Sequence, residues 1–276
     1  MTITSRDIAM DGLEERSRCG TTVVVSLSDM HGLHLNGDII DVPDGDMLVI
    51  AGDIELRSRR DVGNLERWLA SLPHRHKVVG FGNMDTWAYD AGDDLKIEGA
   101  HVVVDRVLEV GGLRLLASPW SPKYAGVWQL ANEAAGRQHW SRLLPPELEL
   151  DVLVTHTPPY GYGDLTRGAH VGDKQLLAAV QAMKRPPRLW ICGHIHEAVG
   201  EYRVPHPAAP QGPGGGILLI NASSFYAAAK KGYERRAQPR AVSLPEGRVV
   251  AQGDLDNLAA AAQDGFDGGR RLGGCE

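Results

Sequence analysis

Residues 44–53 read DGDMLVIAGD, a short apolar run that closes on a glycine and an aspartate. The run Met47–Ala51 has the length and composition of a buried β-strand. In open α/β sheets, ligands bind outside the carboxyl ends of the strands, which is where Asp53 would then lie. The same arrangement of an apolar run followed by polar residues recurs along the chain, and it predicts both the fold and the site.

Other short β-type runs alternate with helical stretches. The predicted strands are residues 22–27, 47–51, 77–81, 101–104, 107–110, 113–117, 151–155, 188–192 and 217–221. Apolar residues spaced three or four apart predict helices over residues 61–72 and 172–183. Gly111-Gly112 favours a hairpin, and the Pro- and Gly-rich residues 205–216 favour a loop or a long hairpin tip. Alternating strands and helices predict a layered α/β fold with a mostly parallel sheet region.

The length of 276 residues is compatible with one compact α/β unit. Residues 1–20 mix charge and glycine without a period and predict a flexible N-terminal arm. Residues 21–253 form the predicted globular domain. From Asp254 the chain is rich in Ala, Gly and Asp, so residues 254–276 are expected to form a weakly ordered C-terminal tail.

Charge and hydropathy restrict the partners. The net charge of -6 argues against long nucleic acid, whose binding depends on Lys and Arg contacts to phosphate. The apolar runs are too short to span a membrane, and the first twenty residues lack the apolar segment of a signal peptide, so cytoplasmic residence is expected. Cys19, Cys192 and Cys275 form no CxxC pair; Cys192 is expected to be a buried thiol. The oligomeric state stays open.

Candidate metal ligands follow five of the predicted strands. They are Asp29, His31, Asp53, Asn83, His156, His194 and His196. Imidazole and carboxylate groups suit zinc, manganese or iron, and two such ions can clamp both the attacking and the leaving oxygen at phosphorus. A single His or Asp at a strand end is more often a cap or a surface residue, but five such ends together favour a metal centre.

Spacing supports the same interpretation. Asp29-x-His31 and His194-x-His196 are expected to place both members of each pair on one side of an extended strand. The glycines before Asp53, Asn83 and His194 are expected to permit tight turns and close backbone approach.

The order DxH, GD, GN, H, GHxH resembles the calcineurin-like metallophosphoesterase superfamily. Longer stretches are similar to the MPPED-type phosphoesterases, a branch that includes nucleotide phosphodiesterases. These stretches are SDMHGLH (28–34), DGDMLVIAGD (44–53), WLASLPHRHK (68–77), SPW (118–120), THTPPY (155–160), CGHIHE (192–197) and NAS (221–223). The resemblance covers about residues 22–226.

The resemblance implies a four-layer αββα sandwich of the metallophosphoesterase type over residues 21–253, with a dimetal site at the C-terminal rim of the strands. It implies that Asp29, His31 and His196 hold one divalent metal, and that Asn83, His156 and His194 hold the other. Asp53 would bridge the two. The metals would be manganese, zinc or iron.

One motif departs from the family pattern. Where the family has Gly-Asn-His, this chain has Gly82-Asn83-Met84. The family histidine is thought to protonate the leaving oxygen, and a thioether has no proton to give. General acid catalysis contributes about 10²–10⁴-fold in rate. Either the substrate has a leaving group that needs no protonation, or Asp85 or His34 supplies the proton, or the protein turns over slowly; the first reading is favoured.

The expected function is hydrolysis of a small phosphoester, favouring a phosphodiester or nucleotide-type substrate, by attack of a metal-bridging hydroxide. A phosphomonoesterase acting on a small metabolite or nucleotide is the first alternative. A metal- and nucleotide-binding protein with weak or no catalysis is the second. Three aromatic residues either line a base-stacking wall or belong to the core: Trp120, Tyr124 and Trp128. His170 is expected to approach the substrate pocket.

Overall fold

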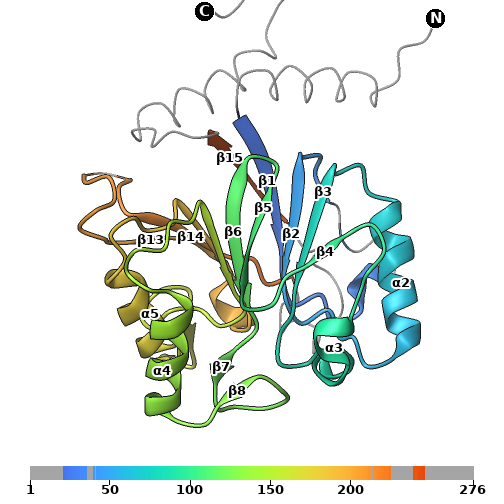
Figure 1. Ribbon diagram of the computed structural model, residues 1–276, viewed down its shortest axis with the longest axis horizontal. Coiled ribbons are helices and arrows are strands. Elements are labelled where there is room, and N and C mark those ends of the chain that lie inside the picture. Colours follow the sequence, from blue (N-terminus) through green and yellow to red (C-terminus); the bar gives the residue numbers. More distant parts are fainter. Residues whose placement is uncertain (1–20, 36–39, 41, 213, 225–238, 246–276) are drawn as a thin grey trace, which may run out of the picture.

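The computed structural model describes residues 21–35, 40, 42–212, 214–224 and 239–245, and it consists of two facing β-sheets with helices on their outer sides (Figure 1). The predicted N-terminal arm and C-terminal tail lie outside the described residues. In the part of the chain that is described, no helix has the length and apolar character needed to cross a membrane.

Among the described residues, the first sheet has five strands. The strands β1 to β4 run parallel, and β15 pairs antiparallel with β1 at the edge of the sheet. In spatial order they are β15 (Arg240–Pro245), β1 (Thr21–Leu27), β2 (Met47–Ala51), β3 (His76–Gly80) and β4 (His101–Val102). The central strands β1 and β2 are almost wholly buried, because both faces of the sheet are covered.

The second sheet has six strands, of which β14, β12, β9 and β6 run parallel and the edge strands β13 and β5 run antiparallel. In spatial order they are β13 (Gly200–Val204), β14 (Ile217–Asn221), β12 (Leu189–Cys192), β9 (Val152–Thr155), β6 (Leu113–Ser118) and β5 (Arg106–Val110).

Three apolar clusters hold the four layers together. Between the sheets, Val49 and Val78 of the first sheet pack with Leu115, Val154 and Ile191 of the second. A second cluster lies where the first sheet meets the helices α2 (Arg59–Ala70) and α3 (Thr86–Ala91). A third lies where the second sheet meets α4 (Glu133–Leu143) and α5 (Lys174–Gln181). The predicted αββα sandwich is confirmed, and the helix pairs lie on opposite sides in Figure 1.

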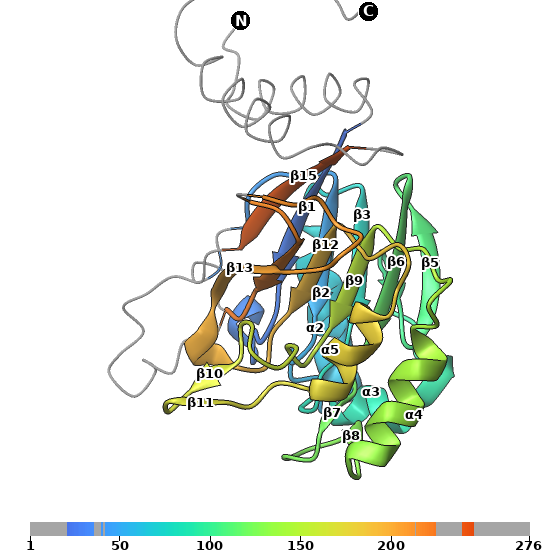
Figure 2. The same cartoon turned by 90° about the vertical axis from the view of Figure 1, so that its left-hand side faces the viewer.

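Short elements gather at the end of the molecule at which the parallel strands finish (Figures 1 and 2). They are the 3-10 turns η1 (Leu33–Leu35), η2 (Gly92–Asp94) and η3 (His196–Ala198), and the strand pairs β7 (Ser121–Pro122) with β8 (Gln129–Leu130) and β10 (Leu165–Thr166) with β11 (Ala169–His170). They form the surroundings of the site.

Candidate metal centre

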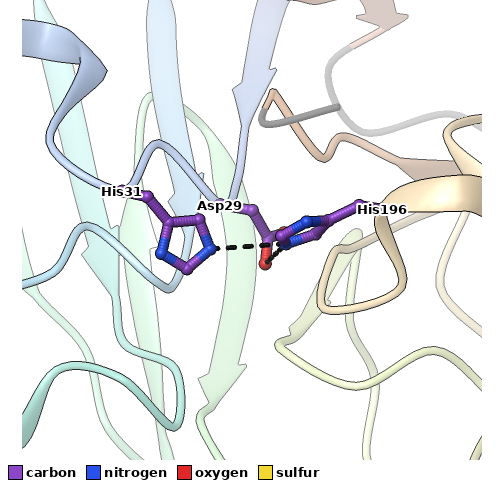
Figure 3. Close-up of side chains that lie close together, drawn as sticks. All are labelled: Asp29, His31 and His196. Atoms are coloured by element: carbon purple, nitrogen blue, oxygen red, sulfur yellow. Dashed lines mark hydrogen bonds and ion pairs between the residues drawn. The ribbon is translucent and has the colours of Figure 1, made fainter. Parts of the chain in front are cut away.

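Two groups of side chains that could hold a metal ion lie at this end, among the residues that the structure describes. Asp29, His31 and His196 form the first group, and Asp53, His156 and His194 form the second. Within each group the donor atoms all lie within 4.8 Å of one another. Figure 3 shows the first group: Nε2 of His31 is 3.3 Å from Nε2 of His196, which is 3.2 Å from Oδ1 of Asp29.

Asp53 is placed to serve both groups. Its Oδ2 is 3.9 Å from Nε2 of His31, and its Oδ1 is 3.4 Å from Nε2 of His156. Asn83 joins the second group, with Oδ1 at 2.9 Å from Nε2 of His156. All seven side chains predicted as metal ligands are therefore brought together by the fold.

The ligands come from turns rather than from strands. Asp29, His31, Asp53 and His194 have φ values of 51°, 42°, 50° and 66°, in the left-handed region that non-glycine residues rarely adopt. The expectation that the x-spaced pairs alternate along an extended strand is therefore wrong. His194 and His196 instead serve different groups, because the chain turns sharply between them into η3. Backbone strain of this kind concentrates at functional sites.

The three glycines before Asp53, Asn83 and His194 allow the close approach that the sequence predicted. A Cβ on Gly52, whose φ is 103°, would lie 2.6 Å from the backbone of Phe81 and Gly82. A Cβ on Gly193 would collide with the side chains of Ser28 and Asp29. A Cβ on Gly82 would collide with Asp53 and would lie 2.6 Å from Nδ1 of His156. Glycine at these positions lets the backbone of one turn lie directly against the ligands carried by another.

Further hydrogen bonds fix the orientation of the predicted metal ligands. The backbone N–H of His194 and the hydroxyl of Ser223 donate to Oδ2 of Asp29 at 2.8 and 2.7 Å, so Oδ1 is left to face His196. Nδ1 of His156 donates to the carbonyl of Ala51 at 3.0 Å, which leaves Nε2 as the atom directed at Asp53 and Asn83. Such hydrogen bonds fix the tautomer and ring orientation of metal-binding histidines.

The charges of the site fit a bound cation. Burial alone would lower the pKa of His156, but Asp53 and Asp29 raise it to about 9. Two oxygens, on Asn83 and Asp53, converge on Nε2 of His156, where either a proton on this nitrogen or a bound cation would satisfy them. Burial, together with the charge on His156, lowers the pKa of His194 to about 4, which keeps that ring in the neutral form that binds metals. The donor set of carboxylate, amide oxygen and imidazole fits divalent transition metals.

The two side chains predicted as substitute acids lie in different surroundings. Both carboxylate oxygens of Asp85 accept backbone N–H groups, from Glu55 and Leu56 on one side and Gly82 on the other. Burial, and then the charge on Asp53, raises the pKa of Asp85 to about 7. Asp85 is fully buried and anchors the turn that carries Asn83. Its role as an acid stays a prediction.

His34 lies beside the helix α2. Its ring centroid is 5.6 Å from that of Trp68, and neither of its ring nitrogens has a hydrogen-bond partner among the described residues. Burial lowers the pKa of His34 to about 4. Neither ligand group includes it. Its role as an acid also stays a prediction.

Of the three aromatic residues proposed for a stacking wall, one faces the site. Tyr124 is 80% exposed, and its ring meets that of His194 edge-on at 5.7 Å. Trp128 is buried and stacks on Phe81, and Trp120 donates to Asp105 beside α4. Trp128 therefore belongs to the core.

The residues at the end of β14 hold the site together, a role that their sequence did not predict. Ser223 bonds to Asp29, and the amide of Asn221 donates to the carbonyls of Gly163 and Ile195, so it holds the turn between His194 and His196. The signal was present, because Asn221-Ala-Ser223 follows an apolar strand in the same way as the metal ligands do.

Comparison with known proteins shows the family of the chain. The sequence profile of the calcineurin-like phosphoesterase family matches residues 23–198. Human metallophosphoesterase domain-containing protein 1 is 34% identical over 211 residues, which is 66% of this chain and 62% of the human protein. An uncharacterized protein of Methanocaldococcus jannaschii is 28% identical over 185 residues, covering 63% of this chain and 80% of the archaeal one.

One solved structure shares the fold. The crystal structure of phosphopantetheinyl hydrolase from Mycobacterium tuberculosis superimposes with a TM-score of 0.51 at 15% identity, and the match covers 84% of this chain and 99% of the other. With the family profile, the two side-chain groups make up a dinuclear site for divalent metal ions.

Proposed function

Because this chain belongs to the calcineurin-like phosphoesterase family, we propose that it hydrolyses small phosphoesters with the help of two divalent metal ions. The observation that carries the proposal is the position of Asp53, whose two carboxylate oxygens face one ligand group each. The chain spans 62% of the length of the human relative, so the proposal concerns the activity of this domain.

The residues of the chain define what such a site does. Asp29, His31 and His196 would hold one ion, and Asn83, His156 and His194 the other, with Asp53 shared. Two divalent ions supply positive charge at the phosphoryl oxygens and lower the pKa of water. Tyr124 forms an exposed aromatic edge against His194, where it would meet the organic part of a substrate.

We favour a phosphodiester or a nucleotide-type ester as the substrate, with a phosphomonoester as the rival. The sequence motifs that resemble the MPPED-type branch favour the diester. Met84 favours an ester with a good leaving group, because its side chain has no proton to offer. Its backbone N–H donates to Oδ1 of Asp53 at 2.8 Å, so this residue lies beside the predicted metal ligands.

The test compares an activated aryl diester, an activated aryl monoester and ordinary nucleotides on the full chain reloaded with manganese, zinc or iron. We expect the aryl diester to turn over fastest, since its leaving group needs no protonation. Faster turnover of the monoester would make the protein a phosphatase. Turnover of none of them, with both metals bound, would favour a metal- and nucleotide-binding protein.

A substitution at Met84 distinguishes a catalyst from a protein that only binds its ligand. Met84→His restores the family residue at a half-buried position beside Asp53, and we expect it to raise turnover of nucleotides by about 10²-fold or more. Turnover of the aryl diester is expected to change little. An equal rise for both classes of ester would mean that leaving-group protonation is not what Met84 removes.

A further inference from the structure

A cavity of about 400 Å³ opens beside the metal centre, at the N-terminal ends of α4 and α5. One wall is the segment that joins β7 to β8, with Lys123, and another is the segment from β11 into α5, with His170 and Lys174. Tyr160, which follows His156 by four residues in the sequence, also lines the cavity. None of the functions described above uses this cavity.

Two lysines of the cavity lining point to an anionic ligand. Lys123 and Lys174 are both exposed, and neither forms an ion pair with a residue that the structure describes. Lys174 lies over the ring of Tyr160, with Nζ 4.8 Å from the ring centroid. The lining also holds two acidic residues, the exposed Glu133 at the start of α4 and the buried Asp173, which balance the lysines in formal charge.

The helix ends themselves contribute little charge. Asn132 accepts the N–H of Ala135 at the start of α4, and Asp173 accepts those of Gln175 and Leu176 at the start of α5. The other oxygen of Asp173 accepts the indole N–H of Trp140. Asp173 is thus fully engaged, and the lysines are the groups left to meet a ligand.

His170 is held in place for a contact in the same cavity. Its Nδ1 donates to Oδ1 of Asp164 at 2.6 Å, and Asp164 is fully buried. Oδ2 of Asp164 accepts the N–H groups of Gly161 and Gly172, which fixes the carboxylate. The remaining ring nitrogen, Nε2, is therefore the atom of His170 that can bind a ligand.

The cavity adjoins the metal centre through the β7–β8 segment. Tyr124, next to Lys123, lies against His194, and Val127 donates to the carbonyl of Asn83 at 2.9 Å. Gly126 lies so close to Asn83 that a Cβ would collide with its carbonyl. The segment thus contacts two metal-binding residues on one side and lines the cavity on the other.

We propose that this cavity binds a second anionic group, a phosphate or a carboxylate, on the organic part of the phosphoester, with Lys123, Lys174 and His170 as its partners. The proposal rests on the proposed function in that the ester itself would lie at the metal centre. It narrows the substrate class to phosphoesters that carry a further negative charge beyond the ester.

The test is calorimetric binding of non-hydrolysable alkylphosphonates to the manganese-loaded full chain. The probes carry a methyl, carboxylate or phosphonate group at the far end of linkers of graded length. We expect a charged end to tighten binding at one linker length, and Lys174→Gln and Lys123→Gln each to remove about fivefold of that gain. Lys96→Gln, at an exposed lysine outside the cavity, is the matched control and keeps the full gain.

Each outcome decides the proposal, and turnover is not needed. A gain for the carboxylate alone or the phosphonate alone identifies the anion. Equal affinity for charged and methyl ends, at every linker length, overturns the subsite even where the protein hydrolyses esters. A gain that survives in the Lys123→Gln/Lys174→Gln double variant overturns it as well. If the wild-type protein hydrolyses no ester but still binds the charged probes more tightly than the methyl probe, the proposed function is rejected and the subsite stands.

Discussion

The carboxylate of Asp29 divides its two oxygens between two tasks. Oδ1 faces His196 in the first ligand group, and Oδ2 accepts hydrogen bonds from Ser223 and from the backbone of His194. Burial opposes the charge on Asp29, yet the histidines around it hold the pKa of this carboxyl below its usual range. A residue outside the ligand set, Ser223, therefore helps to define the first metal position.

Ser223→Ala tests this contact. Loss of the hydroxyl leaves Oδ2 of Asp29 with one donor fewer, so we expect metal affinity at the first group to fall about 10- to 100-fold. Competition titration with a chelating dye would measure it. Ser224→Ala removes a neighbouring hydroxyl that reaches only the carbonyl of Ala222, at 3.5 Å, and should leave metal affinity unchanged. Equal affinity in both variants would show that the Ser223 contact does not position Asp29.

His34 gives a pH-dependent prediction about stability. Burial lowers its pKa from 6.5 to about 4, so as pH falls below 6.5 the unfolded chain takes up a proton that the folded side chain refuses. Stability is therefore full above pH 6.5 and is lost as pH falls towards 4. The leucine of His34→Leu takes up no proton, so the unfolding free energy of this variant should fall by up to about 3 kcal/mol less than that of wild type over the same pH range.

Urea unfolding near neutral pH and at mildly acidic pH measures the effect of His34. The metal-binding histidines titrate in both proteins and cancel in the difference. His101→Gln, at an exposed histidine, should keep the wild-type slope of unfolding free energy against pH. A His34→Leu variant with that same slope would contradict the prediction.

At the scale of elements, the central strands of both sheets were predictable and several other segments were not. Runs such as Met47–Ala51 and Ile217–Asn221 are strands with the predicted bounds, because buried parallel strands are short and continuously apolar. The predicted helices start within two residues of α2 and α5. The helix α4 was not predicted, since Gly136 within it disfavours a helix and only part of one face is apolar.

The edge strand β13 escaped prediction for a related reason, whereas the edge strand β5 lies within one residue of the predicted range 107–110. β13 (GEYRV) is mostly polar or half-exposed, because an edge strand buries fewer side chains than a central one. In the site, residue types and strand-end positions were enough to select seven side chains that the fold brings together; their role as metal ligands stays a prediction. The left-handed turns that aim them were not predictable from spacing, because non-glycine residues adopt them only where the surrounding fold imposes them.

The turn after β12 depends on Gly193, which gives a prediction at this scale. Gly193→Ala would force a Cβ against Ser28 and Asp29, so we expect a loss of about 1–3 kcal/mol in unfolding free energy and weaker metal binding. Gly63→Ala is the matched control, because Gly63 lies within α2 and an added Cβ would make an ordinary contact with the Arg67 side chain, at 3.7 Å; it should stabilise the protein by about 0.5–1 kcal/mol. Unchanged stability and metal affinity in Gly193→Ala would contradict the close approach.

At the scale of the whole molecule, the metal site joins the two sheets. β1, β2 and β3 of the first sheet lead to Asp29, His31, Asp53 and Asn83, and β9 and β12 of the second lead to the remaining three histidines. Metal binding is therefore a link between the two halves of the sandwich, added to the apolar cluster between them.

This arrangement predicts that metal stabilises the fold. At a free metal concentration about 100 times the Kd, one site adds about 2.7 kcal/mol to the unfolding free energy. Differential scanning calorimetry should show a higher Tm with manganese or zinc and a lower one with chelator. Asp53→Asn should lose most of the increase. A Tm that does not respond to metal would show that the ligand groups do not bind it.

The most direct test of the central claim is the rate of aryl diester hydrolysis, measured together with metal content, for wild type and Asp53→Asn. The account predicts two metal ions per chain in wild type and hydrolysis that chelator abolishes. Asp53→Asn should lose at least about 10²-fold in rate, since the oxygens facing both groups are altered. Asp90→Asn, at an exposed position on α3, should match wild type. Hydrolysis that persists in Asp53→Asn, or in protein stripped of metal, would contradict the account.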